Sequence, residues 1–169
     1  DLHEIQLANT PACFEPSLDY VVTKMPRFPF DKFSSANNKL STQMKATGEV
    51  MSVGRTVEES LLKAARSLEI GVNHLYMKKF DGFTEDEMLA YIKDGTDDRI
   101  YAIAELLRRG TDVGMICNAT KIDMLFLEKI SNIVRAEDKL KEHIGDIDTL
   151  YAAKRLGFSD EYIGRLWDM

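Results

Sequence analysis

One pair of charged residues, Lys45 and Glu49, falls inside a stretch that we expect to be a buried strand, and it is the first candidate for chemistry. The stretch, residues 41–53, has the apolar spacing of two short strands or of one strand bent at Gly48. A buried charge is costly unless it is paired, so a charged pair in such a place often marks the lining of a functional site. The commoner role of such a pair is structural, and spacing alone leaves both roles open.

Neighbouring carboxylates, which serve many enzymes as acids and bases, occur at three places in the sequence. They are Asp97 with Asp98, Glu85 to Glu87, and Asp146 with Asp148. Each group lies where the apolar spacing predicts the start of a helix, and the positive end of a helix dipole favours carboxylates there. We therefore interpret these groups as helix caps rather than as catalytic acids.

The sequence contains no familiar motif for catalysis or metal binding. It has no GxxxxGK[ST] phosphate loop, no G-x-S-x-G elbow and no HExxH pattern. The three histidines, His3, His74 and His143, are scattered, and we expect them on the surface or in loops. Cys13 and Cys117 are far apart, which predicts two reduced thiols and no zinc site. These patterns assign no catalytic, cofactor-binding or metal-binding residue.

The first third of the chain has the composition of extended structure. Residues 18–24 are rich in β-branched and aromatic side chains and predict a strand, which two prolines end. Phe28, Phe30 and Phe33 follow at close spacing. Three such rings could stack on a base or a cofactor, but packing against a core is the commoner use and is what we expect here.

Capping patterns mark the starts of helices along the rest of the chain. Thr56 to Glu59 and Thr84 to Glu87 are capping boxes, and Thr120 is predicted to cap the longest helix. Residues 111–118 are predicted to be a short connection. The remaining helix boundaries follow from caps and glycines: Asp97 or Asp98 with Gly110, then Gly145 with Gly157, and finally Ser159.

The sequence changes character near residue 70, from extended patterns and one helix to a succession of short helices. This change predicts two units, residues 1–69 and residues 70–169. The fold class is therefore predicted to be mainly α, with a small β-containing part in front and an all-helical part behind.

Composition excludes several classes of protein. The 169 residues are 44% hydrophobic and 30% charged, which is typical of a globular chain. The formal net charge of −6 disfavours nucleic-acid binding and contact with an acidic membrane surface. No apolar run approaches the length that spans a bilayer, and no signal peptide is present. With its reduced thiols, the chain is predicted to be cytoplasmic.

A long stretch of the sequence resembles a known family. Residues 14–55 read FEPSLDYVVTKMPRFPFDKFSSANNKLSTQMKATGEVMSVGR and are similar to the large chain of carbamoyl phosphate synthetase. The resemblance continues through TVEESLLKAARSLEIG and, more loosely, through three later segments. These read DRIYAIAELLRRG, TKIDMLFLEKISNIV and LYAAKRLGFSDEYIG, so that essentially the whole chain is covered.

The resemblance implies an internal segment of a larger ligase. In this family two homologous ATP-grasp halves, separated by a helical oligomerisation domain, make carbamoyl phosphate from ATP, bicarbonate and ammonia. Residues 1–69 would then be the end of the first ATP-grasp unit, and residues 70–169 would be most of the oligomerisation domain. The whole enzyme would use ATP with Mg²⁺ or Mn²⁺ and receive ammonia from a glutaminase small chain, whereas this segment would hold neither cofactor.

One residue role follows from the resemblance. Glu49, in the GEVM match, corresponds to a family position that lines the interior passage for carbamate, with Lys45 as a possible charge partner. The helical part would supply self-association, for which its apolar stripes carry a surplus of surface: Ile100, Ile103, Leu106, Leu107, Phe126 and Ile130. The alternative is that these stripes bury one another within one copy.

Two other functions are weighed against this one. A free-standing helical interaction module would use the segment LGFSDEY, residues 156–162, which is similar to part of a ubiquitin-associated domain. A small independent enzyme would use Lys45 and Glu49, but the sequence supplies no nucleotide loop and no acid–base partner for them.

Overall fold

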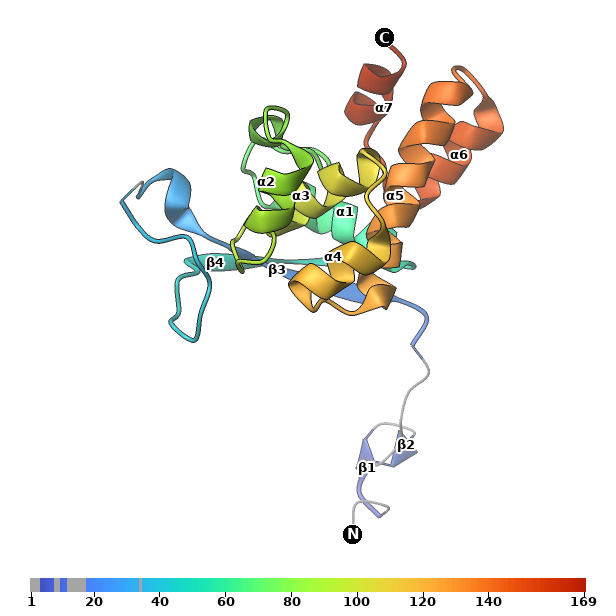
Figure 1. The fold of residues 1–169 in the computed structure, drawn as a ribbon. Helices are drawn as coiled ribbons and strands as arrows, with labels where there is room; N and C mark the ends of the chain where they lie inside the picture. Colours follow the sequence, from blue (N-terminus) through green and yellow to red (C-terminus); the bar gives the residue numbers. More distant parts are fainter. Residues whose placement is uncertain (1–3, 8–9, 12–17, 34) are drawn as a thin grey trace.

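The computed structural model describes residues 4–7, 10–11, 18–33 and 35–169. His3 and Cys13 lie outside this range, so their predicted settings are not addressed. Strands β1 (Gln6–Leu7) and β2 (Thr10–Pro11) form a small antiparallel pair. This pair lies apart from the rest of the chain in Figure 1.

The second sheet is an antiparallel pair that positions Glu49. Strand β3 (Val21–Arg27) pairs with β4 (Gly48–Gly54) in a register that joins Val21 to Gly54 and Arg27 to Gly48. Side chains alternate between half-buried and exposed along β3, as they do in a sheet with one covered face. The predicted strand at residues 18–24 is thus confirmed with both ends three residues later, and the expectation that Pro26 lies beyond it is wrong, because Pro26 pairs with Glu49 within the strand.

The connection between β3 and β4 is irregular, and it contains only a short 3₁₀-helix, Pro29–Asp31. Phe28 and Phe30 stack with their ring centroids 5.6 Å apart, while Phe33 is exposed. The expectation that all three rings pack against a core is therefore wrong for Phe33. Residues 41–47 are not a strand, so only the part of the predicted stretch from Gly48 onward is extended. The Lys45 ammonium donates to two carbonyls of the same connection, those of Asn37 and Lys39.

Helix α1 (Val57–Ser67) follows β4 after a tight turn. Its N-cap is Thr56, whose hydroxyl accepts from the Glu59 amide at 3.1 Å. The Glu59 carboxylate accepts from the amide of Arg55, one residue before the cap, so the predicted capping box is present with its second bond shifted. One face of α1 covers the β3–β4 pair, and α1 also packs against α5 (Met124–Glu142).

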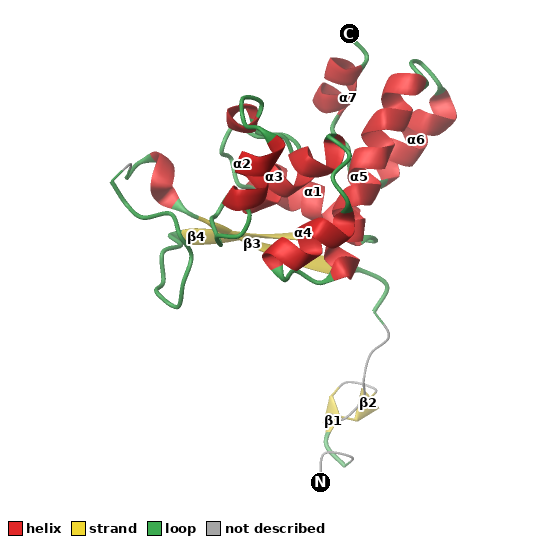
Figure 2. Ribbon diagram, in the orientation of Figure 1, coloured by secondary structure: helices red, strands yellow, loops and turns green. Residues whose placement is uncertain are grey.

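Helices and their connecting loops make up the rest of the described chain, and most of the helices lie above the strand pair in Figure 2. They enclose one apolar core that includes Leu62 of α1, Phe80, Ile103 and Leu127. The elements in order are the 3₁₀-helix Lys78–Phe80, α2 (Glu85–Tyr91), α3 (Arg99–Arg108), α4 (Val113–Thr120), α5, α6 (Ile147–Arg155) and α7 (Asp160–Leu166). None of these helices combines the length and the apolar character needed to cross a membrane.

Most of the predicted helix starts are confirmed. The capping box of α2 has both bonds, from the Glu87 amide to Thr84 and from the Thr84 amide to Glu87. Asp146 caps α6 and Ser159 caps α7. Asp98 occupies the N-cap of α3 but makes no capping bond, because its carboxylate instead accepts from Lys79 and Tyr91.

The predicted connection at residues 111–118 is wrong, since most of it is the helix α4. Asp112 caps this helix by accepting from the amide of Met115, and Lys121 ends it in the left-handed conformation with φ of 61°. Helix α5 therefore begins later than predicted and is capped by Asp123. The Thr120 hydroxyl, predicted to cap α5, donates to a carbonyl of α4.

The chain is mainly α with a small β part, as the sequence predicts. The division at residues 69 and 70 stays a prediction. Because α1 contributes Leu62 and Ala65 to the same core as the later helices, the two predicted units share packing.

Candidate functional site

Glu49 lies near the start of β4, on the sheet face that points away from α1. Its carboxylate is 2.9 Å from the ammonium of Lys24 on β3, and both side chains are more than half exposed. The predicted burial of Glu49 and its pairing with Lys45 are therefore wrong. The strand begins at Gly48, so alternation along β4 turns residue 49 outward and residue 52 toward α1.

The surface around Glu49 is unusually apolar for an exposed sheet face. Val22, Met51 and Val53 are all exposed beside the Lys24–Glu49 pair. The outer face of an antiparallel pair is usually polar, so apolar residues here indicate a surface suited to being covered. The described residues would form only one wall of such a passage, and the role of Glu49 in lining it stays a prediction.

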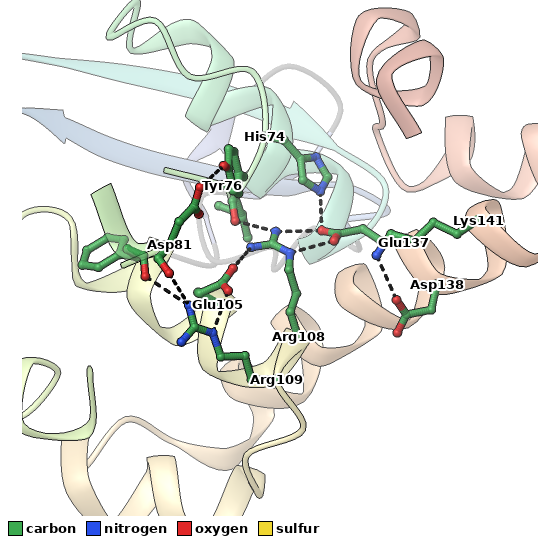
Figure 3. Close-up of polar contacts among 11 residues, drawn as sticks. His74, Tyr76, Asp81, Glu105, Arg108, Arg109, Glu137, Asp138 and Lys141 are labelled. Carbon is green, nitrogen blue, oxygen red and sulfur yellow. Dashed lines mark hydrogen bonds and ion pairs between the residues drawn. The ribbon is translucent and has the colours of Figure 1, made fainter. Parts of the chain in front are cut away.

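The strongest electrostatic feature of the structure is a cluster around the buried carboxylate of Glu137 on α5 (Figure 3). Arg108 of α3 donates to both of its oxygens, with Nε–Oε2 at 2.7 Å and Nη2–Oε1 at 2.8 Å. The His74 ring approaches the same carboxylate with its Nε2 atom, 2.8 Å from Oε1. This two-bond arrangement of arginine and carboxylate fixes geometry as well as charge.

The surroundings shift the pKa values of all three groups. Burial alone would raise the pKa of Glu137, but the hydrogen bonds from Arg108 and His74 outweigh it and hold the value at about 2. Burial lowers the pKa of His74 despite the nearby carboxylate, so the ring is neutral at pH 7 and donates from Nε2. Glu137 outweighs the effect of burial on Arg108 and raises the pKa of that guanidinium.

The cluster also fastens the loop between α1 and α2. Arg108 donates to the carbonyl of Leu75 at 2.6 Å, and the neighbouring Arg109 donates to the carbonyls of Phe80 and Phe83. Glu105 on α3 pairs with both arginines. Every charge here has a partner, and we assign the cluster a structural role that holds the loop to α3 and α5.

His74 lies in a loop, which is one of the two expected settings for the histidines, but it is buried rather than on the surface. Its side chain is 1% exposed and stacks on Tyr162 with a centroid separation of 3.8 Å. Nothing in the sequence next to His74 marks it as buried, because its partners Glu137 and Tyr162 come from two distant helices. His143, by contrast, is exposed as predicted.

A cavity of about 590 Å³ lies between β3, α1, α3 and the start of α5. Its walls are mostly apolar and include Leu61, Ile100 and Phe126. Tyr101 lines it and is 2% exposed, yet its hydroxyl has no hydrogen-bond partner among the described residues. Burial, reinforced by Asp97 and Asp98, raises the pKa of Tyr101 to about 12, so this hydroxyl remains a donor.

Asp97 is one of the few charged residues that line the cavity. Burial first, and the neighbouring Asp98 second, raise the pKa of its carboxyl. Within the described part of the chain, Asp97 forms no ion pair, whereas Asp98 is bound by Lys79. Arg27 and Arg99 also line the cavity, so its charged lining residues include both signs.

The apolar surface predicted for association is mostly internal. Ile103, Leu106, Leu107 and Ile130 are buried within one copy, and of the predicted set only Phe126 is well exposed. The exposed apolar surface of the helical part lies instead at the junction of α4 and α5, with Met115, Met124, Leu125 and Phe126, and near α6, with Ile144, Ile147 and Tyr151. Of these exposed residues, the predicted association set contains only Phe126.

The remaining predicted site features can be placed briefly. Among the residues that the structure describes, no group of three or more His, Cys, Asp or Glu side chains could hold a metal ion. Cys117 is a half-buried free thiol on α4. Phe158 and Tyr162 of the LGFSDEY segment are buried in the core, where a partner protein would not reach them.

Comparison with known families identifies the helical part of the chain. Residues 49–169 match the family model described as carbamoyl-phosphate synthetase large chain, oligomerisation domain. The matched segment starts at Glu49 in β4 and includes α1 to α7.

Proposed function

Since this chain belongs to the carbamoyl-phosphate synthetase large-chain family through its oligomerisation domain, we propose that it serves subunit association and is not catalytic by itself. The observation that carries the proposal is the family match over residues 49–169. Exposed apolar side chains at the α4–α5 junction support it, because apolar surface of this kind tends to acquire a partner.

The wider setting of the chain follows from the family as a proposal. The whole enzyme would join ATP, bicarbonate and ammonia into carbamoyl phosphate, for pyrimidine and arginine synthesis, in the cytoplasm. Residues 1–69 would complete the first ATP-grasp unit, whose nucleotide and Mg²⁺ or Mn²⁺ ligands belong to other parts of the large chain. A glutaminase small chain would supply the ammonia.

Glu49 is proposed to line the carbamate passage once other parts of the large chain cover the outer face of β3 and β4. Two observations support this role. The carboxylate sits among exposed apolar side chains, and its partner Lys24 neutralises it. A neutralised carboxylate in an apolar wall would give carbamate a polar path from which bulk water is excluded.

Sedimentation velocity over a range of protein concentrations tests the association role. We expect the average mass to rise with concentration toward that of a dimer or larger assembly. A strict monomer at the highest concentration would remove the association role from this chain, although not its family.

Calorimetric titration with Mg-ATP tests the absence of catalysis. We expect no heat of binding, because the nucleotide-binding part of an ATP-grasp unit would lie elsewhere in the large chain. Micromolar binding that depends on Glu49 or Lys45 would contradict the proposal and favour the small independent enzyme.

A further inference from the structure

The surface at the start of α5 combines a protrusion with a hollow. Met124 and Leu125 are exposed on the first turn of the helix, and Phe126 is also about half exposed. We call these three residues the knob. Phe126 at the same time lines the 590 Å³ cavity, together with Ile122 from the loop before α5 and Ile130 one turn later in the helix. Knob and cavity therefore share an edge.

Such a surface can complement itself. In a two-fold dimer the same patch of both copies meets. If one feature of the first copy contacts a different feature of the second copy, the reverse contact forms as well. A patch that carries both an apolar knob and an apolar hollow satisfies this condition, because the knob of each copy can enter the hollow of the other. The cavity is wide enough for several side chains, and Val57, Leu61 and Met77 give it apolar walls.

Charges on the two features are also complementary. Lys121 is exposed directly before the knob, at the left-handed end of α4. Asp97 and Tyr101 both line the cavity, and the Tyr101 hydroxyl has no hydrogen-bond partner among the described residues. If Lys121 enters the cavity with the knob, its ammonium would reach the carboxylate of Asp97, which has no ion pair among the described residues. The same ammonium would donate to the buried hydroxyl of Tyr101.

Resting on the proposed association function, we propose that two copies of this chain bind through a two-fold contact in which the knob of each fills the cavity of the other. Lys121 of each copy pairs with Asp97 of its partner. The other exposed apolar groups fit this role less well. Ile144, Ile147 and Tyr151 near α6 do not line the large cavity, and Val22 on the outer sheet face lies before the matched family segment.

Sedimentation velocity of a knob variant and a matched control tests the contact. Leu125→Glu places a charge on the knob, and Ile147→Glu makes the same change at a comparably exposed position on α6. We expect Leu125→Glu to raise the dimer dissociation constant at least tenfold and Ile147→Glu to leave it within twofold of the parent value. Equal dimerisation of Leu125→Glu and the parent chain, or loss of dimers only in Ile147→Glu, would overturn the contact. A parent chain that stays monomeric would overturn the association function itself.

A charge exchange gives a second, independent measurement. Lys121→Glu and Asp97→Lys should each weaken dimerisation, and the double variant should recover at least half of the loss in affinity because the ion pair is restored with reversed sign. Far-ultraviolet circular dichroism checks that each variant is folded. Equal or additive losses in the double variant would show that Lys121 and Asp97 do not meet.

Discussion

Glu49 and Glu137 carry the same chemical group in opposite settings, and their partners differ accordingly. Glu49 is exposed, and its ion pair with Lys24 is screened by water, so it adds little to stability. Glu137 is 1% exposed, and its carboxylate is held by Arg108 and His74. Removing one partner of such a buried pair leaves the other charge without solvation.

Glu137→Ala tests this dependence at the residue scale. We expect the free energy of unfolding to fall by about 3–5 kcal/mol, because Arg108 would be left buried without its carboxylate. The control is Asp138→Ala, one residue along α5, where an exposed carboxylate pairs with Lys141 and the expected change is below about 1 kcal/mol. Urea unfolding measures both, and similar losses in the two variants would contradict the structural role of the cluster.

The cluster also predicts how stability depends on pH. The pKa of His74 is lowered in the folded chain by burial, so below its ordinary value of 6.5 the unfolded chain binds a proton that the folded chain does not. Stability from this group is therefore complete above pH 6.5 and declines as the pH falls. Glu137, with a pKa held at about 2 against 4.5 when unfolded, adds a second decline below pH 4.5.

Urea unfolding at pH 7 and pH 5 measures the first decline. We expect the parent chain to be less stable at pH 5, and His74→Asn to reduce the difference while keeping a donor for Glu137. The exposed His143 supplies the control, since His143→Asn should leave the difference unchanged. A difference that persists in His74→Asn would assign the pH dependence to other groups.

At two glycines, Gly54 and Gly157, the backbone packs closely against the first turn of α1. A Cβ atom at Gly54 would come within 2.7 Å of the Ser60 amide nitrogen, and one at Gly157 would come within 3.0 Å of the Glu59 Cα atom. Gly157 also has φ of 91°, and its carbonyl accepts from Arg66 of α1 at 2.6 Å. The turn between α6 and α7 therefore packs directly against α1, which lies almost a hundred residues earlier in the chain.

Gly157→Ala and Gly145→Ala separate the two reasons for glycine at these turns. Both residues have positive φ, but a Cβ at Gly145 meets nothing within 4 Å. We expect Gly145→Ala to cost about 1 kcal/mol from backbone conformation alone and Gly157→Ala to cost clearly more, because it also pushes against α1. Thermal unfolding measures the difference, and equal costs would mean that the contact with α1 yields without strain.

The elements that sequence patterns predicted well are those whose signals are local. Thr84 and Ser159 cap their helices as expected, because a cap depends on residues three positions apart. Helix α4 was missed because Gly114 and Cys117 weaken its periodic pattern. The burial of His74 and the partner of Glu49 could not be predicted, since each depends on residues that only tertiary packing or strand register brings close.

At the scale of the whole molecule, α1 belongs to two layers. On one side its Ser60 hydroxyl meets that of Thr23 on β3 at 2.7 Å. On the other side the buried Glu58 carboxylate accepts from Asn132 on α5 at 2.8 Å. The strand pair and the helical part are therefore joined through one helix rather than by a flexible linker, and we expect them to lose structure together.

Two probes of unfolding test this cooperativity. Trp167, the one tryptophan of the sequence, donates its indole N–H to the carbonyl of Leu140, so its fluorescence reports the docking of the end of α7 on α5. Circular dichroism reports all helices. We expect both signals to change with the same urea midpoint. A fluorescence transition at clearly lower urea would show that α7 detaches before the rest unfolds.

The double attachment of α1 bears on how such a segment could be exchanged between genes. A recombination joint between the codons for residues 69 and 70 would part Glu58 from Asn132 and Arg66 from Gly157, and the transferred helices would arrive with an uncovered core. A joint just before the codons for β4 would keep α1 in the same transferred segment as its helical partners, although it would part β4 from β3. The inherited unit defined by these contacts thus begins before α1, as does the family match that starts at residue 49.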